Sequence, residues 1–241
     1  MARSRATAFG TQSAAYERAR PEYPPGAVAW LAGDASDIAD VGAGTGKLTR
    51  ALVALGGRRV VAVDPDPAML AVLRTLLPDV PIHLGAGEQL PLPDASMDLV
   101  TFAQSWHWVD AERGSAEVAR VLRPGGAIGL VWNTRDESVD WVSELVAITQ
   151  GGRTVAATKA HPFLGREFDR RAERTWRWEL PTTPEGLVDL ASSFSYVITS
   201  PRRAEILDAV RRLAATHPDL AGHAEFSVPY LTRAYRARRM R

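Results

Sequence analysis

The segment DVGAGTG at positions 40–46 contains a glycine-rich turn of the kind that brings a ligand against the main chain. Glycine lets the backbone turn tightly and leaves the space that a Cβ atom would fill. An acidic residue, Asp64, follows about 20 residues later, where a carboxylate can accept hydrogen bonds from both hydroxyls of a ribose. Asp64 would alternatively cap the next helix, but its spacing from Gly44 favours ribose binding. The pair predicts a cofactor that contains a nucleoside.

The spacing of the glycines disfavours two other nucleotide-binding loops. A dinucleotide fingerprint requires a small residue three positions after Gly44, where this chain has Lys47. A P-loop requires glycine at position 41 and a hydroxyl at position 48, where the chain has Val41 and Leu48. Nicotinamide redox chemistry is therefore disfavoured, and nucleoside triphosphate chemistry is excluded.

The glycine-rich turn lies within a repeated alternation of short apolar runs and helical stretches. The apolar runs predict strands at 38–41, 60–63, 82–84, 97–103 and 127–132. The stretches between them predict helices at 46–55, 67–76 and 112–122, with Asp66 as the N-cap of the second. Such alternation is typical of a parallel sheet with helices on both faces, whose ligands bind at the carboxyl ends of the strands.

The two ends of the chain follow a different pattern. Short helices are expected at 14–20 and at 25–31, before the first strand. After residue 133 we expect helices near 139–148, 184–193 and 201–216, together with a strand at 175–180. A last strand is expected within 225–237, and Pro229 should put a defect in it.

The composition excludes several classes of function. The 241 residues include 29 Lys+Arg and 28 Asp+Glu, and this balance predicts no nucleic-acid partner. The chain has no cysteine, which removes disulfides, thiol nucleophiles and thiolate metal sites. With no signal peptide and no apolar run long enough for a bilayer, we expect a cytoplasmic protein without a membrane partner. Only Lys47 and Lys159 are lysines, so arginine carries nearly all the positive charge, either through coding bias or because some arginines bind an anion.

Five ordered blocks resemble the class I S-adenosylmethionine-dependent methyltransferases of the methyltransferase type 11 group, which includes ubiquinone/menaquinone-type and trans-aconitate-like branches. The blocks are DVGAGTGKLT at 40–49, VVAVDPDPAML at 60–70, GAGEQLPLPDASMDLVTFAQSWHWVD at 85–110, LRPGG at 122–126 and FGTQSAAYERARPEYP at 9–24. The resemblance implies a single-domain, Rossmann-like α/β fold. Its seven-stranded, mostly parallel sheet would have the order 3-2-1-4-5-7-6, with helices on both faces and an N-terminal helical cap. The expected parts are a cap at 1–36, a cofactor-binding core at 37–133, and a substrate-side insertion with the last two strands at 134–241.

The resemblance also implies S-adenosyl-L-methionine as the cofactor, S-adenosyl-L-homocysteine as its product, and no metal. The positions that correspond to the family's cofactor contacts are Tyr16, Arg20, Asp40, Gly42, Ala43, Gly44, Asp64, Pro65, Met69, Ala86, Gly87, Glu88, Gln104 and Ser105. The glycine-rich turn would run beneath the methionine part, with Asp40 holding its ammonium group directly or through water. Asp64 would take the ribose hydroxyls, and Arg20 is the candidate partner for the carboxylate. Many relatives place an acid where this chain has Ala86, which leaves Glu88 or backbone groups to bind the adenine amino group.

The substrate side is expected just after the fourth and fifth strands. His107 is the candidate general base because the pKa of a free histidine lies near working pH, although a histidine between Trp106 and Trp108 equally suits packing. Arg135 would face the crevice and suit a carboxylate-bearing substrate. We therefore expect O- or C-methylation of a small-molecule acceptor by in-line methyl transfer. The alternative is a non-catalytic S-adenosylmethionine-binding module or partner subunit on the same fold, and both a monomer and a homodimer remain open.

Overall fold

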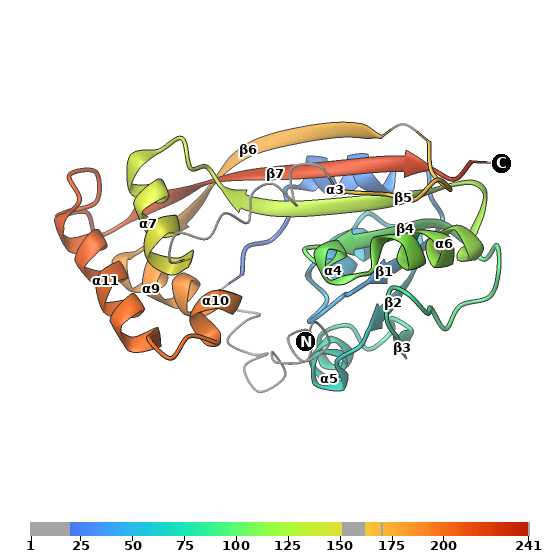
Figure 1. Cartoon of the computed structure of the whole chain (residues 1–241), viewed down its shortest axis with the longest axis horizontal. Coiled ribbons are helices and arrows are strands. Elements are labelled where there is room, and N and C mark those ends of the chain that lie inside the picture. The colour runs from blue at the N-terminus through green and yellow to red at the C-terminus, as the bar shows by residue number, and fades with distance from the viewer. Residues whose placement is uncertain (1–19, 151–161, 170, 241) are drawn as a thin grey trace.

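The computed structural model describes residues 20–150, 162–169 and 171–240. Its centre is a seven-stranded sheet with the order β3-β2-β1-β4-β5-β7-β6 (Figure 1). The pairs from β3 to β5 are parallel, and β7 runs antiparallel to both β5 and β6. The predicted strand order and the mostly parallel character of the sheet are confirmed. The predicted helix at 14–20 and Tyr16 lie outside the described residues, apart from Arg20.

The strands at the centre of the sheet are largely buried, as expected for a sheet covered on both faces. The parallel strands are β1 (Asp37–Val41), β2 (Arg59–Asp64), β3 (Ile82–Leu84), β4 (Met97–Ala103) and β5 (Leu122–Arg135). Helices α3 (Pro25–Ala32) and α4 (Lys47–Ala54) pack on one face, in a cluster that includes Leu31, Leu52 and Leu99. The helix α6 (Ala111–Val121) packs on the other face, in a cluster that includes Phe102 and Val118. The expected helices on both faces are therefore present.

The helix α5 (Pro67–Leu76) begins where the sequence predicts it. The Asp66 side chain accepts a hydrogen bond from the Ala68 N–H at 2.9 Å. Pro67 occupies the first turn, where a backbone N–H would have no partner within the helix, so proline loses no hydrogen bond there. The cap fixes the chain direction just after β2, and it therefore also fixes the position of Asp64.

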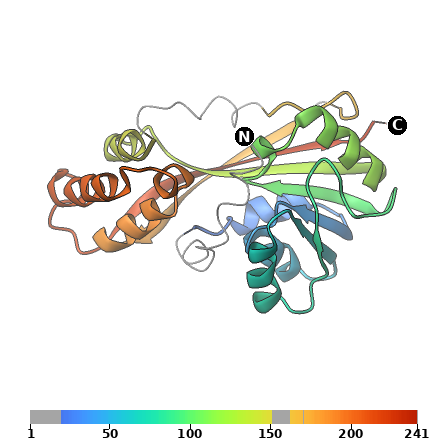
Figure 2. The ribbon, with the colours of Figure 1, turned by 60° about the horizontal axis from the view of Figure 1, so that its bottom comes forward.

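The last strands are longer than the sequence predicts. Strand β5 begins at Leu122, so it includes residues 123–126, which lie between the predicted helix at 112–122 and the predicted strand at 127–132. A register shift against β4 and a left-handed Gly125 accommodate these residues. The long strands β5, β6 (Ala172–Thr182) and β7 (Phe226–Arg238) run out of the core at the carboxyl end of β5 (Figures 1 and 2).

These extensions carry a helical lobe at the carboxyl ends of the parallel strands (Figure 2). The lobe consists of α7 (Asp140–Gln150), α9 (Pro184–Ser192), α10 (Ser195–Ile198) and α11 (Arg203–Thr216). Its helices share a hydrophobic cluster of their own, which includes Trp141, Leu187 and Leu213, and Tyr230 of β7 joins this cluster. In the described ranges, no helix is both long and apolar enough to span a membrane.

Candidate cofactor and acceptor site

In the glycine-rich turn after β1, Gly42 and Gly44 are both left-handed but have different surroundings. Gly42 has φ +66°, and a Cβ there would lie 2.5 Å from the Cβ of Ser105, so this glycine allows close packing against the end of β4. Gly44 has φ +57°, and a Cβ there would meet no atom within 4 Å because the residue lies on the wall of an open pocket. Gly44 therefore leaves its main chain accessible to a ligand.

Asp64 connects the end of β2 to this turn. One carboxylate oxygen accepts the Gly44 N–H at 2.8 Å, and the other accepts the Asp66 N–H at 2.8 Å. The residue is 6% exposed, and burial raises the pKa of its carboxyl to about 6, although the two backbone hydrogen bonds lower it. Each oxygen retains lone-pair capacity for a further donor.

Asp40 lies beneath the turn and is fully buried. One of its oxygens accepts the Thr49 hydroxyl at 2.7 Å, and the other accepts the Thr101 hydroxyl at 3.0 Å. Burial raises the pKa of Asp40 to about 6, against the lowering effect of these two hydrogen bonds, and the nearby charge of Asp64 adds to the rise. The two threonines were not predicted from the sequence. Their hydroxyls satisfy Asp40 from the helix below and from the adjacent strand.

The end of β4 supplies a strained residue at the pocket wall. Gln104 has φ +57°, a conformation that is uncommon for a residue with a side chain and is concentrated at functional sites. Its side-chain amide donates to the Asn133 carbonyl at 2.9 Å. The Ser105 hydroxyl donates to the Val41 carbonyl at 2.9 Å, which ties β4 to the glycine-rich turn.

The segment at residues 20–23 is held against the wall of the pocket. Glu22 pairs with Lys47 at 3.0 Å and with Arg50 at 2.5 Å, both on the helix that follows the glycine-rich turn. The Asn133 side chain donates to the Glu22 carbonyl at 3.0 Å and accepts the Thr232 hydroxyl at 2.7 Å. These contacts fix the segment that carries Arg20. The sequence gives no local signal for Asn133, because its partners are distant in the chain.

The pocket brings together six of the predicted site residues. The described residues that line it are Arg20, Pro21, Tyr23, Gly42, Ala43, Gly44, Thr45, Lys47, Leu48, Ala103, Gln104, Asn133, Arg135 and Tyr230. Asp40 and Asp64 lie just behind the turn and shape it through the hydrogen bonds described above. Lys47, Asn133 and Tyr230 are pocket residues that were not predicted from the sequence as site residues.

The predicted adenine-side residues lie along the ends of β2 and β3, outside this pocket. Pro65 is exposed, whereas Met69 is buried in α5. Gly87 is buried, and a Cβ there would lie 2.8 Å from Val109. The Glu88 carboxylate accepts the Asp110 N–H at 2.9 Å. The adjacent Ala86 forms an isolated bridge with Gln89.

The segment Trp106–Trp108 forms a short 3-10 helix after β4. Trp106 is buried in the sheet core, packs edge-on against Phe102 and donates its indole N–H to the Phe163 carbonyl at 2.9 Å. His107 lies 4.7 Å from Trp108 between ring centres. These three side chains are not among the described residues that line the pocket, and their predicted substrate-side and general-base roles stay predictions.

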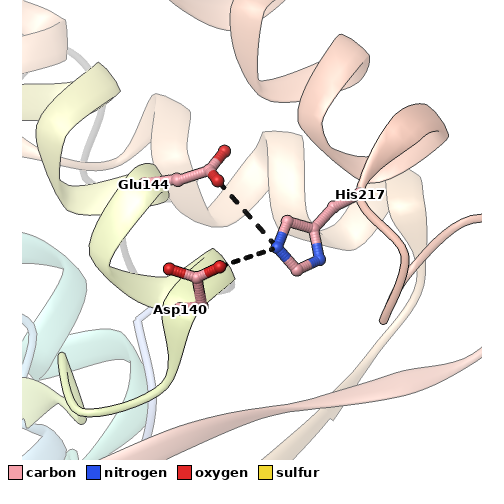
Figure 3. A group of neighbouring side chains, drawn as sticks. All are labelled: Asp140, Glu144 and His217. Carbon is pink, nitrogen blue, oxygen red and sulfur yellow. Dashed lines mark ion pairs between the residues drawn. The ribbon is translucent and has the colours of Figure 1, made fainter.

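A second group of titratable side chains lies in the helical lobe, away from this pocket. His217, just after α11, has its Nε2 atom 3.7 Å from Asp140 and 4.0 Å from Glu144, both on α7 (Figure 3). Its other ring nitrogen accepts the Asp219 N–H at 3.2 Å and lies 3.9 Å from the Asp219 carboxylate. These side chains connect α7 to the residue that follows α11.

Comparisons with known proteins agree with this geometry. The sequence model of a methyltransferase domain family matches residues 39–130. The chain is 49% identical to an uncharacterized methyltransferase of Mycobacterium tuberculosis over 98% of its own length and 97% of the relative's. It is 36% identical to an uncharacterized methyltransferase-like protein of Schizosaccharomyces pombe, covering 94% of this chain and 93% of that one. The solved structure of a putative type II methyltransferase from Anaeromyxobacter dehalogenans aligns with a TM-score of 0.67 at 27% identity, over 91% of this chain and 97% of the other.

Proposed function

The chain belongs to the class I S-adenosylmethionine-dependent methyltransferases, and we propose that it methylates oxygen or carbon on a small-molecule acceptor. The cofactor would lie across the carboxyl ends of β2, β1 and β4. The observation that carries the proposal is the hydrogen bond from the Gly44 N–H to the Asp64 carboxylate. It connects a glycine whose main chain is accessible to a ligand with an acid in the position for binding a ribose.

The residues at this edge fit such a cofactor. Gly44 borders open space where the cofactor's amino-acid part would pass. The Asp64 carboxylate has lone pairs left for two ribose hydroxyls. One oxygen of the neighbouring Asp66 is buried with no hydrogen-bond partner among the described residues, which supports a polar group at the same edge. Asp40 is fully buried beneath the turn and does not line the pocket, so we assign it to the ammonium group through water.

When bound, S-adenosylmethionine supplies a methyl group activated by its sulfonium. The protein's own task is then to position the acceptor in line, exclude water and balance charge. Gln104, locked in a left-handed conformation at the end of β4, borders the place of transfer. The segment held by Glu22 places Arg20 and Tyr23 on the pocket wall, where they would help to exclude water. An ionised carboxylate acceptor needs no base, whereas a hydroxyl or carbon acid would use one, for which His107 is the candidate.

Calorimetric titration with S-adenosylhomocysteine tests the cofactor, and transfer of labelled methyl groups into a small-molecule extract tests the acceptor class. We expect one binding site for S-adenosylhomocysteine, no heat with NAD, and label in molecules that pass a filter which retains macromolecules. The absence of binding heat contradicts the cofactor assignment. Label confined to retained protein or nucleic acid contradicts a small-molecule acceptor.

A further inference from the structure

We propose that the methyl acceptor carries an oxyanion, a carboxylate or a phosphate, and that Arg135 binds it where the sheet meets the helical lobe. The inference rests on the proposed function, because it specifies the acceptor of that same site. It concerns residues of β5, β7 and the lobe that lie outside the stretch 39–130 matched by the family model.

Arg135 is the last residue of β5 and pairs in register with Tyr230 of β7. Its guanidinium carbon lies 4.3 Å from the centre of the Phe194 ring, which the lobe supplies between α9 and α10. Arg20 approaches the same ring, with its guanidinium carbon at 5.3 Å, and donates to the Ser193 carbonyl at 3.1 Å. Phe194 is buried, so it gives both guanidinium groups a fixed apolar surface to lie on. Such stacking orients the planar fork that suits carboxylate or phosphate.

The charge around this point favours an anion. Of the described residues that line the pocket, none is acidic, and the cationic ones are Arg20, Arg135 and Lys47, of which Lys47 is paired with Glu22. Burial lowers the pKa of Arg135, and the like charge of Arg20 lowers it further, while Tyr230 and Glu137 act in the opposite direction. An oxyanion at this point would be attracted by both guanidinium groups, which lie against the same Phe194 ring.

The strand order assigns Arg135 to the acceptor rather than to the cofactor. The ribose-binding Asp64 ends β2, the glycine-rich turn follows β1, and Gln104 follows β4, so the proposed cofactor spans three adjacent strands. Arg135 ends the next strand, β5, beyond the sulfonium end of that span. An acceptor bound by Arg135 would therefore lie between the helical lobe and the sulfonium end of the cofactor. In-line methyl transfer requires the acceptor to be at that end.

Fractionation of a small-molecule extract on an anion exchanger tests the charge of the acceptor. The retained and unretained fractions are each incubated with the wild-type enzyme and methyl-labelled S-adenosylmethionine. We expect the label to enter molecules of the retained fraction, and acceptor activity found only in the unretained fraction overturns the proposal. Treating the retained fraction with alkaline phosphatase beforehand separates the two sources, because it removes phosphate monoester acceptors and leaves carboxylates intact.

Variants of Arg135 test the residue itself. Arg135→Gln should lower kcat/KM for the retained fraction at least tenfold, mainly through KM, because it removes a charge-assisted hydrogen bond. Arg135→Lys keeps the positive charge but lacks the two-pronged guanidinium group, so its kcat/KM should lie between those of wild type and Arg135→Gln. Arg202→Gln is the matched control, since Arg202 is exposed and pairs with Glu205 at 2.8 Å on the lobe surface.

The dissociation constant of S-adenosylhomocysteine, measured on every variant, reports both folding and the cofactor site. The proposal predicts that it stays within twofold of wild type in Arg135→Gln. Unchanged acceptor KM in that variant, or an equal loss of cofactor affinity, overturns the role of Arg135. Failure of the proposed function has a different signature, because the wild-type protein would then give no heat with S-adenosylhomocysteine.

Discussion

Replacing Asp64 with asparagine tests whether this carboxylate serves the cofactor rather than the fold. The carboxylate accepts the Gly44 and Asp66 N–H groups, one on each oxygen, at 2.8 Å. Asparagine keeps one acceptor oxygen and turns an NH2 group toward the other N–H, so one hydrogen bond is lost. Leaving such a buried group unsatisfied costs about 1–3 kcal/mol of unfolding free energy.

The same substitution removes a buried negative charge, which acts in the opposite direction. Burial raises the pKa of Asp64 from 3.8 to about 6, which corresponds to about 3 kcal/mol for keeping the carboxylate ionised at pH 7. The unfolding free energy of Asp64→Asn at pH 7 should therefore stay within about 2 kcal/mol of wild type. Because the folded pKa is the higher one, the stabilisation associated with Asp64 is complete below pH 4 and is lost as the pH rises through about 6. Urea unfolding at pH 4.5 and pH 7 should show a smaller pH dependence in the variant.

Cofactor affinity should respond far more than stability. A hydrogen bond to a charged acceptor contributes about 1.5–3 kcal/mol, so S-adenosylhomocysteine should bind Asp64→Asn about 10- to 100-fold more weakly by calorimetry. Asp98→Asn is the matched control, because Asp98 also accepts two backbone N–H groups, from Ser36 and Asp37, but at the amino ends of the strands. The control should lose unfolding free energy and keep full affinity. A dissociation constant within twofold of wild type in Asp64→Asn would show that this carboxylate does not bind the cofactor.

Three further predictions concern the same site. Gly44→Ala should cost about 1–2 kcal/mol of unfolding free energy from its left-handed backbone and weaken S-adenosylhomocysteine binding more than tenfold, since its Cβ enters the pocket. Gly125→Ala is the control, because Gly125 has φ +80° and equally open surroundings but lies away from the pocket. It should lose similar unfolding free energy and bind S-adenosylhomocysteine with wild-type affinity, and equal affinities in the two variants would contradict the prediction. The dissociation constant of S-adenosylhomocysteine for the wild-type protein should rise as the pH is lowered from 7 to 5, because Asp40 and Asp64, both with a pKa of about 6, take up protons. A dissociation constant that does not change over this pH range contradicts the prediction. A general-base role for His107 predicts that His107→Ala loses about 100-fold or more in turnover at unchanged cofactor affinity, and near-normal turnover rules the role out.

Features set by local residues could be predicted from the sequence. Helix α5 spans Pro67–Leu76 as expected, because an N-cap acid and a first-turn proline define its start. The turn after β1 needs left-handed glycines, and the sequence has glycine at these positions. Strands Ile82–Leu84 and Met97–Ala103 also have the predicted bounds.

Features set by contacts between distant strands could not be predicted in this way. Thr101 satisfies Asp40 because the two residues are register partners of parallel strands, 61 positions apart. The sequence predicts a defect at Pro229 in the last strand, but β7 continues through this residue and pairs it with Glu179 of β6. Its carbonyl accepts the Asp136 N–H at 2.9 Å, so its nitrogen faces the side of β5, one position past the last paired residue of that strand, and not the side of β6. Phe194 joins the site only because the long strands bring the lobe over the sheet edge.

The position of the cofactor is best determined by a crystal structure of the protein with S-adenosylhomocysteine. We expect ribose hydroxyls within hydrogen-bonding distance of the Asp64 carboxylate, the amino-acid part over the turn at Gly44, and the sulfur directed toward the side of Arg135. Ribose bound away from Asp64, or a sulfur atom directed away from β5, would contradict this expectation.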